Sequence, residues 1–226
     1  MKNKVMTAQD AIRDIKDGAV IMVGGFMACG TPENLIDALV EKNVRNLTVI
    51  CNDAGLPGHG TGKLLSNGQI KKLVATHVGL NPEVAERMNT EDPERKLECV
   101  LIPQGTFAEA IRAGGAGLGG VLTPTGIGTI VAEGKQIINI DGKDFLLEKP
   151  LKADFALIRG SVTDTFGNTV YHGTTQTFNP MMAMAAEHVI CGAETVVEVG
   201  EINPNHVVTS GILVDAVVGG APAWTN

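Results

Sequence analysis

The chain contains no dense basic segment and no long apolar segment. Its 226 residues include 18 lysines and arginines against 25 acidic residues, for a formal net charge of −7, and no basic run is longer than Lys71-Lys72. An acidic chain of this kind is not expected to bind nucleic acid or an anionic membrane surface. The N-terminal segment MKNKVMTAQDAIRDIKDG has no apolar signal core, and no later segment has the roughly 18 uninterrupted apolar residues of a membrane span. These absences predict a cytoplasmic protein.

The sequence also lacks the spacings that hold metal ions or disulfide bonds. Its four cysteines lie far apart, with no CxxC pair and no mixed Cys/His ligand spacing. They are Cys29, Cys51, Cys99 and Cys191. The five histidines show neither metal-ligand spacing nor a clear Ser or Cys partner, which favours structural or surface roles for them. Neither a zinc site nor a disulfide framework is therefore expected, and the cysteines are expected to be reduced.

What the sequence does contain is the composition of a folded α/β protein. Hydrophobic residues make up 44% of the chain and charged residues 19%, which is typical of globular rather than disordered proteins. The 28 glycines indicate many tight turns or close backbone approaches. Splitting a chain of this length would leave two small halves, so a single domain over residues 1–226 is expected.

Residues 17–32, DGAVIMVGGFMACGTP, contain an informative local pattern. The short apolar run at 19–23 is bounded by Asp-Gly before it and by two glycines after it, which is typical of a buried strand. Thr31 can cap a following helix, with Pro32 in its first turn and Glu33 placed favourably for the helix dipole. The pattern predicts a strand, a glycine loop and a helix in succession.

The alternation of strand and helix continues along much of the chain. Apolar runs predict strands, and apolar positions at helical spacing with capping residues predict helices. Further strands are expected over 46–51, 69–77, 97–103 and 153–159, with a strand pair over 188–199. Helices are expected over 7–17, 31–40, 81–88, 104–115 and 179–188. The segment QIINIDGKDFLLE at 136–148 instead predicts an antiparallel hairpin that turns at Asp141-Gly142.

This order of elements predicts an α/β fold. The expected architecture is an open, mainly parallel twisted sheet with helices on both faces and an antiparallel hairpin insertion. In such sheets, ligands bind outside the carboxyl ends of the strands. The glycine loop after the first strand and the loop at 103–105 are both expected there.

Two glycine-rich motifs resemble nucleotide-binding signatures but lack the required context. Residues 115–120 fit GxGxxG, yet they follow a predicted helix and do not open one, so a dinucleotide site is rejected. Residues 58–64, GHGTGKL, have one residue too few for a P-loop and lack the Ser or Thr that would hold magnesium. The second segment is expected to be a flexible loop.

A few polar residues near the predicted sheet edge are candidates for chemistry. Gln104 offers a neutral amide that can donate hydrogen bonds to a developing oxyanion, although pattern alone favours a local cap at the helix start. Glu33 is a candidate nucleophile beside the glycine loop, but its place in the first helical turn is explained by the dipole alone. Nothing in the surroundings of Glu109 or Glu133 singles them out.

Taken together, these segments resemble the family I CoA-transferases. DGAVIMVGGFMACGTP is similar to the first-subunit signature of that family, with Asp-Gly, a hydrophobic run, Gly-Gly-Phe and Gly-x-Pro at the same spacing. The resemblance continues through PENLIDAL, PQGT, RAGGAG, TPTGIGT and FNPMMAMAA, and it covers nearly the whole chain. It is closest to the first (alpha) subunit of the short-chain members, the acetate or butyrate-acetoacetate type, and to the N-terminal half of the succinyl-CoA:3-ketoacid type.

The resemblance implies a ping-pong transfer of CoA. A glutamate attacks the acyl-CoA thioester, a mixed anhydride becomes an enzyme glutamyl-CoA thioester, and CoA passes to an acceptor carboxylate. In the family this nucleophile lies in a Ser-Glu-Asn-Gly segment of the second (beta) subunit, and no SENG occurs in this chain. The chain is therefore expected to act only with that second CoA-transferase subunit, in an α2β2 assembly, with CoA as a substrate and no tightly bound cofactor.

The resemblance also implies roles for particular residues. Gln104 corresponds to the oxyanion-hole glutamine of the family. The expected CoA-contacting loop consists of Gly24, Gly25, Phe26, Met27, Ala28, Cys29 and Gly30. Many relatives have Gly-x-x-Gly after the Phe, and the Met-Ala-Cys found here bears on the shape of the acyl pocket. The choice among acetate, butyrate and acetoacetate stays open. So do two other functions, a sugar-phosphate isomerase of similar fold and a non-catalytic ligand-binding module.

Overall fold

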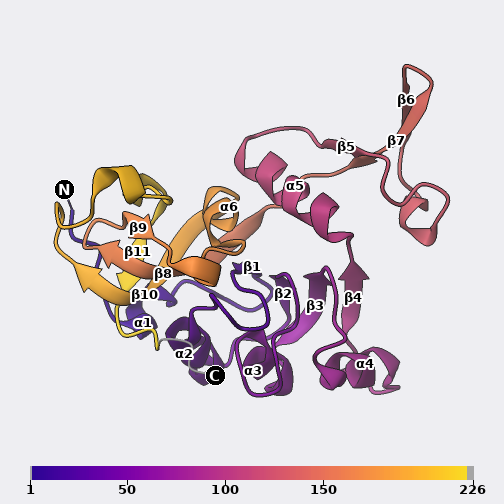
Figure 1. Ribbon diagram of the computed structural model, residues 1–226. Coiled ribbons are helices and arrows are strands. Elements are labelled where there is room, and N and C mark those ends of the chain that lie inside the picture. Colours follow the sequence, from indigo (N-terminus) through magenta and orange to yellow (C-terminus); the bar gives the residue numbers. More distant parts are fainter. Residues whose placement is uncertain (1, 223–226) are drawn as a thin grey trace.

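The computed structural model describes residues 2–222, and a parallel sheet runs through its centre (Figure 1). Seven strands are hydrogen-bonded in the order β11-β10-β8-β1-β2-β3-β4, all parallel, and an eighth strand, β9, pairs antiparallel with β8. In chain order the strands are β1 (Val20–Val23), β2 (Leu47–Ile50), β3 (Ile70–Ala75), β4 (Glu98–Leu101), β8 (Ala153–Asp164), β9 (Thr169–Val170), β10 (Ala186–Val197) and β11 (Ala216–Val218).

Helices cover both faces of this sheet (Figure 1). On one face lie α1 (Ala8–Ala11), α2 (Glu33–Lys42), α3 (Thr61–Ser66) and α4 (Pro82–Asn89). On the other lie α5 (Gln104–Gly115) and α6 (Asn179–Met184). Four single turns of 3₁₀ helix occur in the connections, namely η1 (Ile130–Ala132), η2 (Gly173–Thr175), η3 (Pro204–His206) and η4 (Gly211–Leu213). The fold class predicted from the alternating pattern is confirmed.

Each face of the sheet buries its own apolar cluster. One cluster joins the α1–α4 layer to the sheet, with Leu35, Leu39 and Leu73 all fully buried. The other joins α5 and α6 to the opposite face, where Phe107 and Phe178 meet edge to face with their ring centroids 5.5 Å apart. Fully burying such a side chain contributes about 1.5 to 3 kcal/mol. The strands are therefore held from both sides, as continuous apolar runs in a parallel sheet require.

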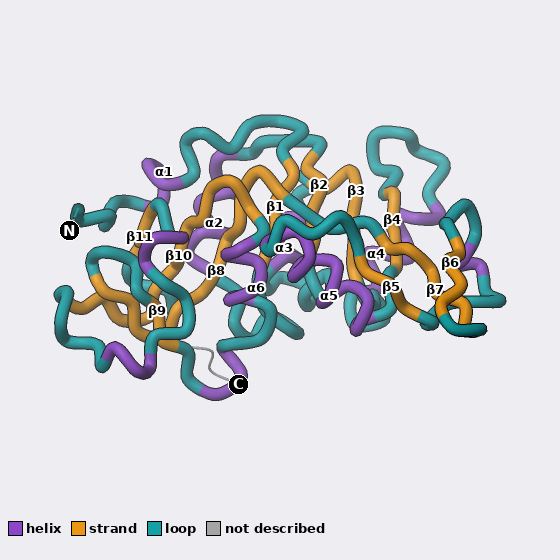
Figure 2. The backbone as a smooth tube through the Cα atoms, turned by 90° about the horizontal axis from the view of Figure 1, so that it is seen from above, coloured by secondary structure: helices purple, strands orange, loops and turns teal. Residues whose placement is uncertain are grey.

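The antiparallel insertion forms a separate small sheet. Its three strands are β5 (Val121–Thr123), β6 (Ile137–Ile140) and β7 (Lys143–Glu148), in the order β5-β7-β6. Asp141 and Gly142 both have positive φ, as the tight hairpin turn between β6 and β7 requires. Figure 2 shows this sheet at the end of the molecule away from the N-terminus, beyond the edge strand β4. The predicted hairpin is confirmed.

Local sequence signals explain where several helices begin. Thr7 caps α1, because its hydroxyl accepts from the backbone N–H of Asp10. Asn81 caps α4, because its side-chain oxygen accepts from the backbone N–H of Glu83. The expected cap at Thr31 is wrong. Pro32 takes the capping position of α2, while the Thr31 hydroxyl donates to the carbonyl of Gly24.

Three other local expectations are corrected. The segment at 58–64, expected to be a flexible loop, contains the start of α3. Gly60, which has a positive φ, is the N-cap residue of that helix. The helix expected over 7–17 has only one turn, α1. The strand pair expected over 188–199 is a single strand, β10, which begins at Ala186. The helix expected over 179–188 is therefore shorter than predicted and ends at Met184. Within residues 2–222, no helix is long and apolar enough to cross a membrane.

Candidate functional site

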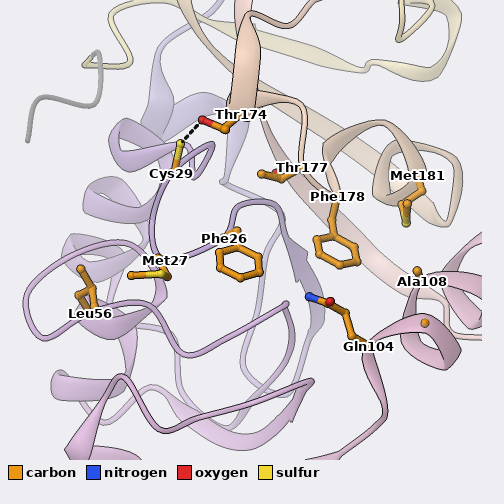
Figure 3. A pocket seen from close by; sticks show the side chains of 11 residues that line it. Phe26, Met27, Cys29, Leu56, Gln104, Ala108, Thr174, Thr177, Phe178 and Met181 are labelled. Carbon is orange, nitrogen blue, oxygen red and sulfur yellow. Dashed lines mark hydrogen bonds between the residues drawn. The ribbon is translucent and has the colours of Figure 1, made fainter.

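A cavity of about 960 Å³ opens at the carboxyl ends of β1 and β2, between the two helical layers (Figure 3). The loop after β1 contributes Phe26, Met27 and Cys29, and the loop after β2 contributes Leu56. The start of α5 contributes Gln104, Gly105 and Ala108. The segment that includes η2 and α6 contributes Thr174, Thr177, Phe178 and Met181. The predicted loop and the predicted glutamine therefore share one cavity.

The loop after β1 contains a tight turn whose two central residues are not glycines. Phe26 and Cys29 exchange two backbone hydrogen bonds of 2.8 and 2.9 Å, which closes a two-residue turn. The central residues Met27 and Ala28 have φ of 49° and 66°. Such conformations cost about 1 to 3 kcal/mol each when the residue is not glycine. The Asp53 carboxylate helps to hold the turn, because its Oδ2 accepts from the Met27 N–H at 2.9 Å.

The glycines on either side of this turn make room for protein atoms. A Cβ on Gly24 would lie 1.7 Å from Oδ1 of Asn179, and a Cβ on Gly25 would lie 2.1 Å from the Thr31 hydroxyl. Gly30 has φ of 77°, and a Cβ on it would lie 2.8 Å from the carbonyl oxygen of Thr175. The structure thus gives these glycines a packing role, and the exposed part of the loop is its Phe26-Met27 tip.

Gln104 is the first residue of α5, and its side chain enters the cavity instead of capping the helix. Figure 3 shows its amide directed toward the rings of Phe26 and Phe178. Its Nε2 donates to Oδ1 of Asn52 at 2.8 Å. Asn52 lies just beyond the end of β2 and is completely buried. The amide of Gln104 is therefore hydrogen-bonded to a side chain that is itself enclosed by the protein.

Sequence reasoning missed three buried polar residues that shape the site. Asn52 and Asp53 lie just beyond the end of β2 and are 0% and 5% exposed. Asn179 is also fully buried, and its side-chain amide donates to the carbonyls of Gly30 at 2.9 Å and Thr175 at 2.8 Å. Two adjacent polar residues directly after an apolar strand are a signal for the carboxyl edge of a parallel sheet. That signal was available for Asn52 and Asp53 in the segment NLTVICND.

Glu33 lies outside the cavity. Its Oε1 accepts from the Gly60 N–H at 2.7 Å, and its Oε2 lies 2.7 Å from Nζ of Lys63. Burial lowers the pKa of Lys63, but hydrogen bonds to Asp37 and Glu33 outweigh it, so that the pKa lies above its ordinary value of 10.5. The structural interpretation of Glu33 is supported, and its carboxylate is committed to joining α2 to α3. Glu109 pairs with Arg112 on the surface of α5.

The cavity is uncharged. The eleven described residues that line it include no Lys, Arg, His, Asp or Glu. Its polar groups are the Gln104 amide, two threonine side chains and the thiol of Cys29, whose Sγ lies 3.0 Å from Oγ1 of Thr174. Such a surface can bind an apolar chain and can stabilise a developing oxyanion through an amide N–H. It contains no carboxylate nucleophile and no general base.

The other thiols do not reach this site. Burial raises the pKa of Cys51, with a further contribution from the nearby negative charge of Asp53, and burial also raises the pKa of Cys191. Raised pKa values keep these thiols protonated and unreactive. Among the residues described, no group of three His, Cys, Asp or Glu side chains has the geometry to hold a metal ion.

Comparison with known proteins agrees with this geometry. A family model described as Coenzyme A transferase matches residues 5–220. The chain is 50% identical to the alpha subunit of the acetate CoA-transferase of Escherichia coli K12, over 96% of this chain and 97% of that relative. It is 49% identical to the acetoacetyl-CoA:acetate/butyrate CoA transferase alpha subunit of Clostridium acetobutylicum, over 96% and 98% of the two chains.

A solved structure shows the same architecture. The acyl-CoA transferase of Escherichia coli O157:H7, crystallised as a thioester complex with CoA, matches 99% of this chain with a TM-score of 0.83 and 25% identity. This chain spans 50% of the length of that longer protein. The sheet, the cavity at its carboxyl edge and the sequence matches lead to one conclusion. The chain belongs to the coenzyme A transferase family.

Proposed function

We propose that this chain is the first (alpha) subunit of a heteromeric CoA-transferase that moves CoA between short-chain acyl-CoAs and carboxylates such as acetate, butyrate and acetoacetate. The observation that carries the proposal is a cavity whose lining has an amide donor, Gln104, and no carboxylate of its own. Transfer through a covalent glutamyl intermediate requires a carboxylate. That carboxylate therefore comes from a second (beta) subunit, as the family resemblance implies.

The chemistry divides between the two subunits. The partner's glutamate attacks the thioester carbonyl and expels CoA as a thiolate, which leaves a mixed anhydride. The CoA thiolate then attacks the glutamyl carbonyl of that anhydride, which releases the donor carboxylate and gives the glutamyl-CoA thioester. An acceptor carboxylate takes the CoA by the same steps in reverse and frees the glutamate. At each tetrahedral stage, negative charge develops on the former carbonyl oxygen. The Gln104 amide donates a hydrogen bond to that oxygen, which favours the transition state over the ground state.

The loop 24–30 is the proposed contact for CoA. Its tip, Phe26 and Met27, is exposed and forms one wall of the cavity. The rigid turn keeps this wall in place while the long CoA molecule binds, so that binding energy remote from the reacting carbon can align thioester and carboxylate. Because this chain is acidic overall, phosphate recognition is assigned largely to the partner.

The uncharged lining supports monocarboxylic acyl groups as substrates. A second carboxylate, as in succinyl-CoA, would meet no cation among the residues that line the cavity. Leaving a charge unpaired in an apolar site is unfavourable. With the complete enzyme, kcat/KM for succinyl-CoA is expected to fall at least about tenfold below that for butyryl-CoA, equivalent to about 1.4 kcal/mol. Equal values for the two thioesters would contradict this substrate class.

The alternative functions are less well supported. A sugar-phosphate isomerase needs cationic or backbone groups for phosphate and a base for proton transfer, and the cavity lining contains neither a cation nor a base. A non-catalytic binding module would bind acyl-CoA without exchange even beside its partner. An α2β2 assembly and a cytoplasmic location complete the proposal.

The decisive test is CoA exchange between acetoacetate and butyryl-CoA or acetyl-CoA. The chain alone is expected to be inactive, and the chain co-purified with its SENG-containing partner is expected to be active. In that complex, Gln104→Ala is expected to lower kcat about 10² to 10³-fold, or about 3 to 4 kcal/mol. Glu109→Gln on the exposed face of the same helix is the matched control and should leave exchange unchanged. Full activity of the chain alone would refute the two-subunit site.

A further inference from the structure

A short chain of side-chain hydrogen bonds connects the turn after β1 with Gln104. Oδ2 of Asp53 accepts from the Met27 N–H and from Nδ2 of Asn52, each at 2.9 Å. Oδ1 of Asn52 accepts from Nε2 of Gln104 at 2.8 Å, and the Thr76 hydroxyl lies 3.1 Å from the same oxygen. Asn52 is completely buried and does not line the cavity, so any effect that it has on the reaction acts through the residues it bonds, of which Gln104 is the one that lines the cavity.

The donors and acceptors in this network fit together in only one way. Backbone N–H groups of Met27 and Gly55 donate to Oδ2 and Oδ1 of Asp53, so both carboxylate oxygens are acceptors. Asn52 must therefore turn its Nδ2 toward Asp53, which leaves Oδ1 facing Gln104. Gln104 must then offer Nε2, and not Oε1, to Asn52.

We propose that Asn52 is a positioning residue that fixes which way the amide of Gln104 faces, and that Asp53 fixes Asn52. The inference rests on the proposed role of Gln104 as the oxyanion donor. One N–H of its amide is held by Asn52, and within residues 2–222 the other N–H and Oε1 have no hydrogen-bond partner. That arrangement leaves a donor available to the cavity in a fixed plane.

The orientation has a direct chemical consequence. If the amide of Gln104 turned over, Oε1 would replace Nε2 and would place a partial negative charge in the network next to Oδ1 of Asn52. A Gln104 freed from Asn52 can rotate between orientations, and only some of them direct an N–H at the reacting oxygen. Preorganised donors stabilise a developing charge without reorganisation during the reaction. Loss of Asn52 is therefore expected to lower kcat while leaving binding of the thioester largely intact.

The test is a double-mutant cycle in the complete two-subunit enzyme. Asn52→Leu has a similar shape and removes all three side-chain hydrogen bonds of Asn52, to Asp53, Gln104 and Thr76. It is expected to lower kcat about tenfold with little change in KM, a smaller effect than complete removal of an oxyanion donor. In a Gln104→Ala background the same substitution is expected to have almost no further effect on kcat, because the group that it positions is already gone.

The matched control is Gln69→Leu, which removes another fully buried amide far from the cavity, one that donates to the carbonyls of Leu39 and Val44. It is expected to lower stability without changing kcat of the folded enzyme. If Asn52→Leu does not fold, Asn52→Ala removes the same amide without adding a charge beside Asp53, and its effect on kcat must vanish in the Gln104→Ala background as well. An equal loss of kcat in both backgrounds, or a loss confined to KM, would overturn the proposal.

A second readout separates this inference from the proposed function. An inactive wild-type complex would count against the proposed function. Even then, ¹⁵N relaxation of the Gln104 side-chain amide reports directly how mobile that amide is. The amide is expected to be rigid in the wild type and mobile in Asn52→Leu. Equal mobility in the two proteins would refute the positioning role whatever the enzyme catalyses.

Discussion

At the scale of single residues, Gly24, which follows β1, must be a glycine because a distant side chain, that of Asn179, packs against it. A methyl group on Gly24 would overlap the buried amide of Asn179, which bonds to three backbone groups. Gly24→Ala is therefore expected to lower the free energy of unfolding by about 3 kcal/mol, through overpacking and loss of buried hydrogen bonds. Urea denaturation would measure this loss. Gly79→Ala, where a Cβ meets open space, is the control, and equal losses for both variants would contradict the explanation.

A second residue-scale prediction concerns alkaline pH. Burial and the negative charge of Asp53 raise the pKa of Cys51 above its ordinary value of 9.0. The folded state therefore holds the thiol proton more tightly than the unfolded state. The resulting stability is complete below pH 9.0 and is lost as pH rises above that value. Chemical denaturation across this range should show a steeper loss for the wild type than for Cys51→Ala, and parallel curves would argue against a buried, protonated thiol.

At the scale of elements, the Glu33–Lys63 pair connects α2 to the start of α3. Glu33→Gln would place an amide nitrogen or a neutral oxygen where Lys63 now meets a carboxylate at 2.7 Å. The expected loss of unfolding free energy is about 2 kcal/mol, typical of a hydrogen bond to a charged group. CoA exchange in the complex should remain unchanged, because this carboxylate lies outside the cavity. Glu41→Gln, on the exposed side of α2, is the stability control.

Elements with strong local signals could be predicted, and elements defined by distant contacts could not. The helices at 81–88 and 104–115 and the Asp141-Gly142 hairpin follow from residues within a few positions of one another. α3 was missed because its glycines read as a loop, whereas packing against α2 makes the segment helical.

The candidate site divides in the same way. The strand pattern placed Gln104 and the loop 24–30 at the same edge of the sheet. Phe26, Met27 and Cys29 of that loop line the cavity with Gln104, whereas its glycines pack against protein atoms. The contact between Gln104 and Asn52 joins residues 52 positions apart, and no periodicity signals it. The ion pair between the buried Arg159 on β8 and Glu194 on the neighbouring strand β10 could not be predicted either. An arginine in an apolar strand gives no local indication of its partner.

At the scale of the whole molecule, the two sheets should differ in local stability. Strand β6 is mostly exposed and β7 is buried only at Leu146 and Glu148, whereas three of the four residues of β1 are buried. Amide protons in β5–β7 are therefore expected to exchange through local opening, while those of β1 and β8 require global unfolding. Hydrogen exchange followed by mass spectrometry would measure this difference. Equal protection of both sheets would show that they unfold as one unit.

The position of β1 inside the main sheet also has a consequence for synthesis. On one side β1 pairs with β2, which follows soon after it in the chain. On the other side it pairs with β8, and there the Val20 N–H donates to the side chain of Asp154, 134 residues later. At about 5 to 20 residues per second, a ribosome needs on the order of ten seconds to make that segment. During this time one apolar strand edge of the nascent chain has no partner. During that interval, the unpaired edge of β1 is the site where we expect a chaperone to bind or an incorrect strand to pair first.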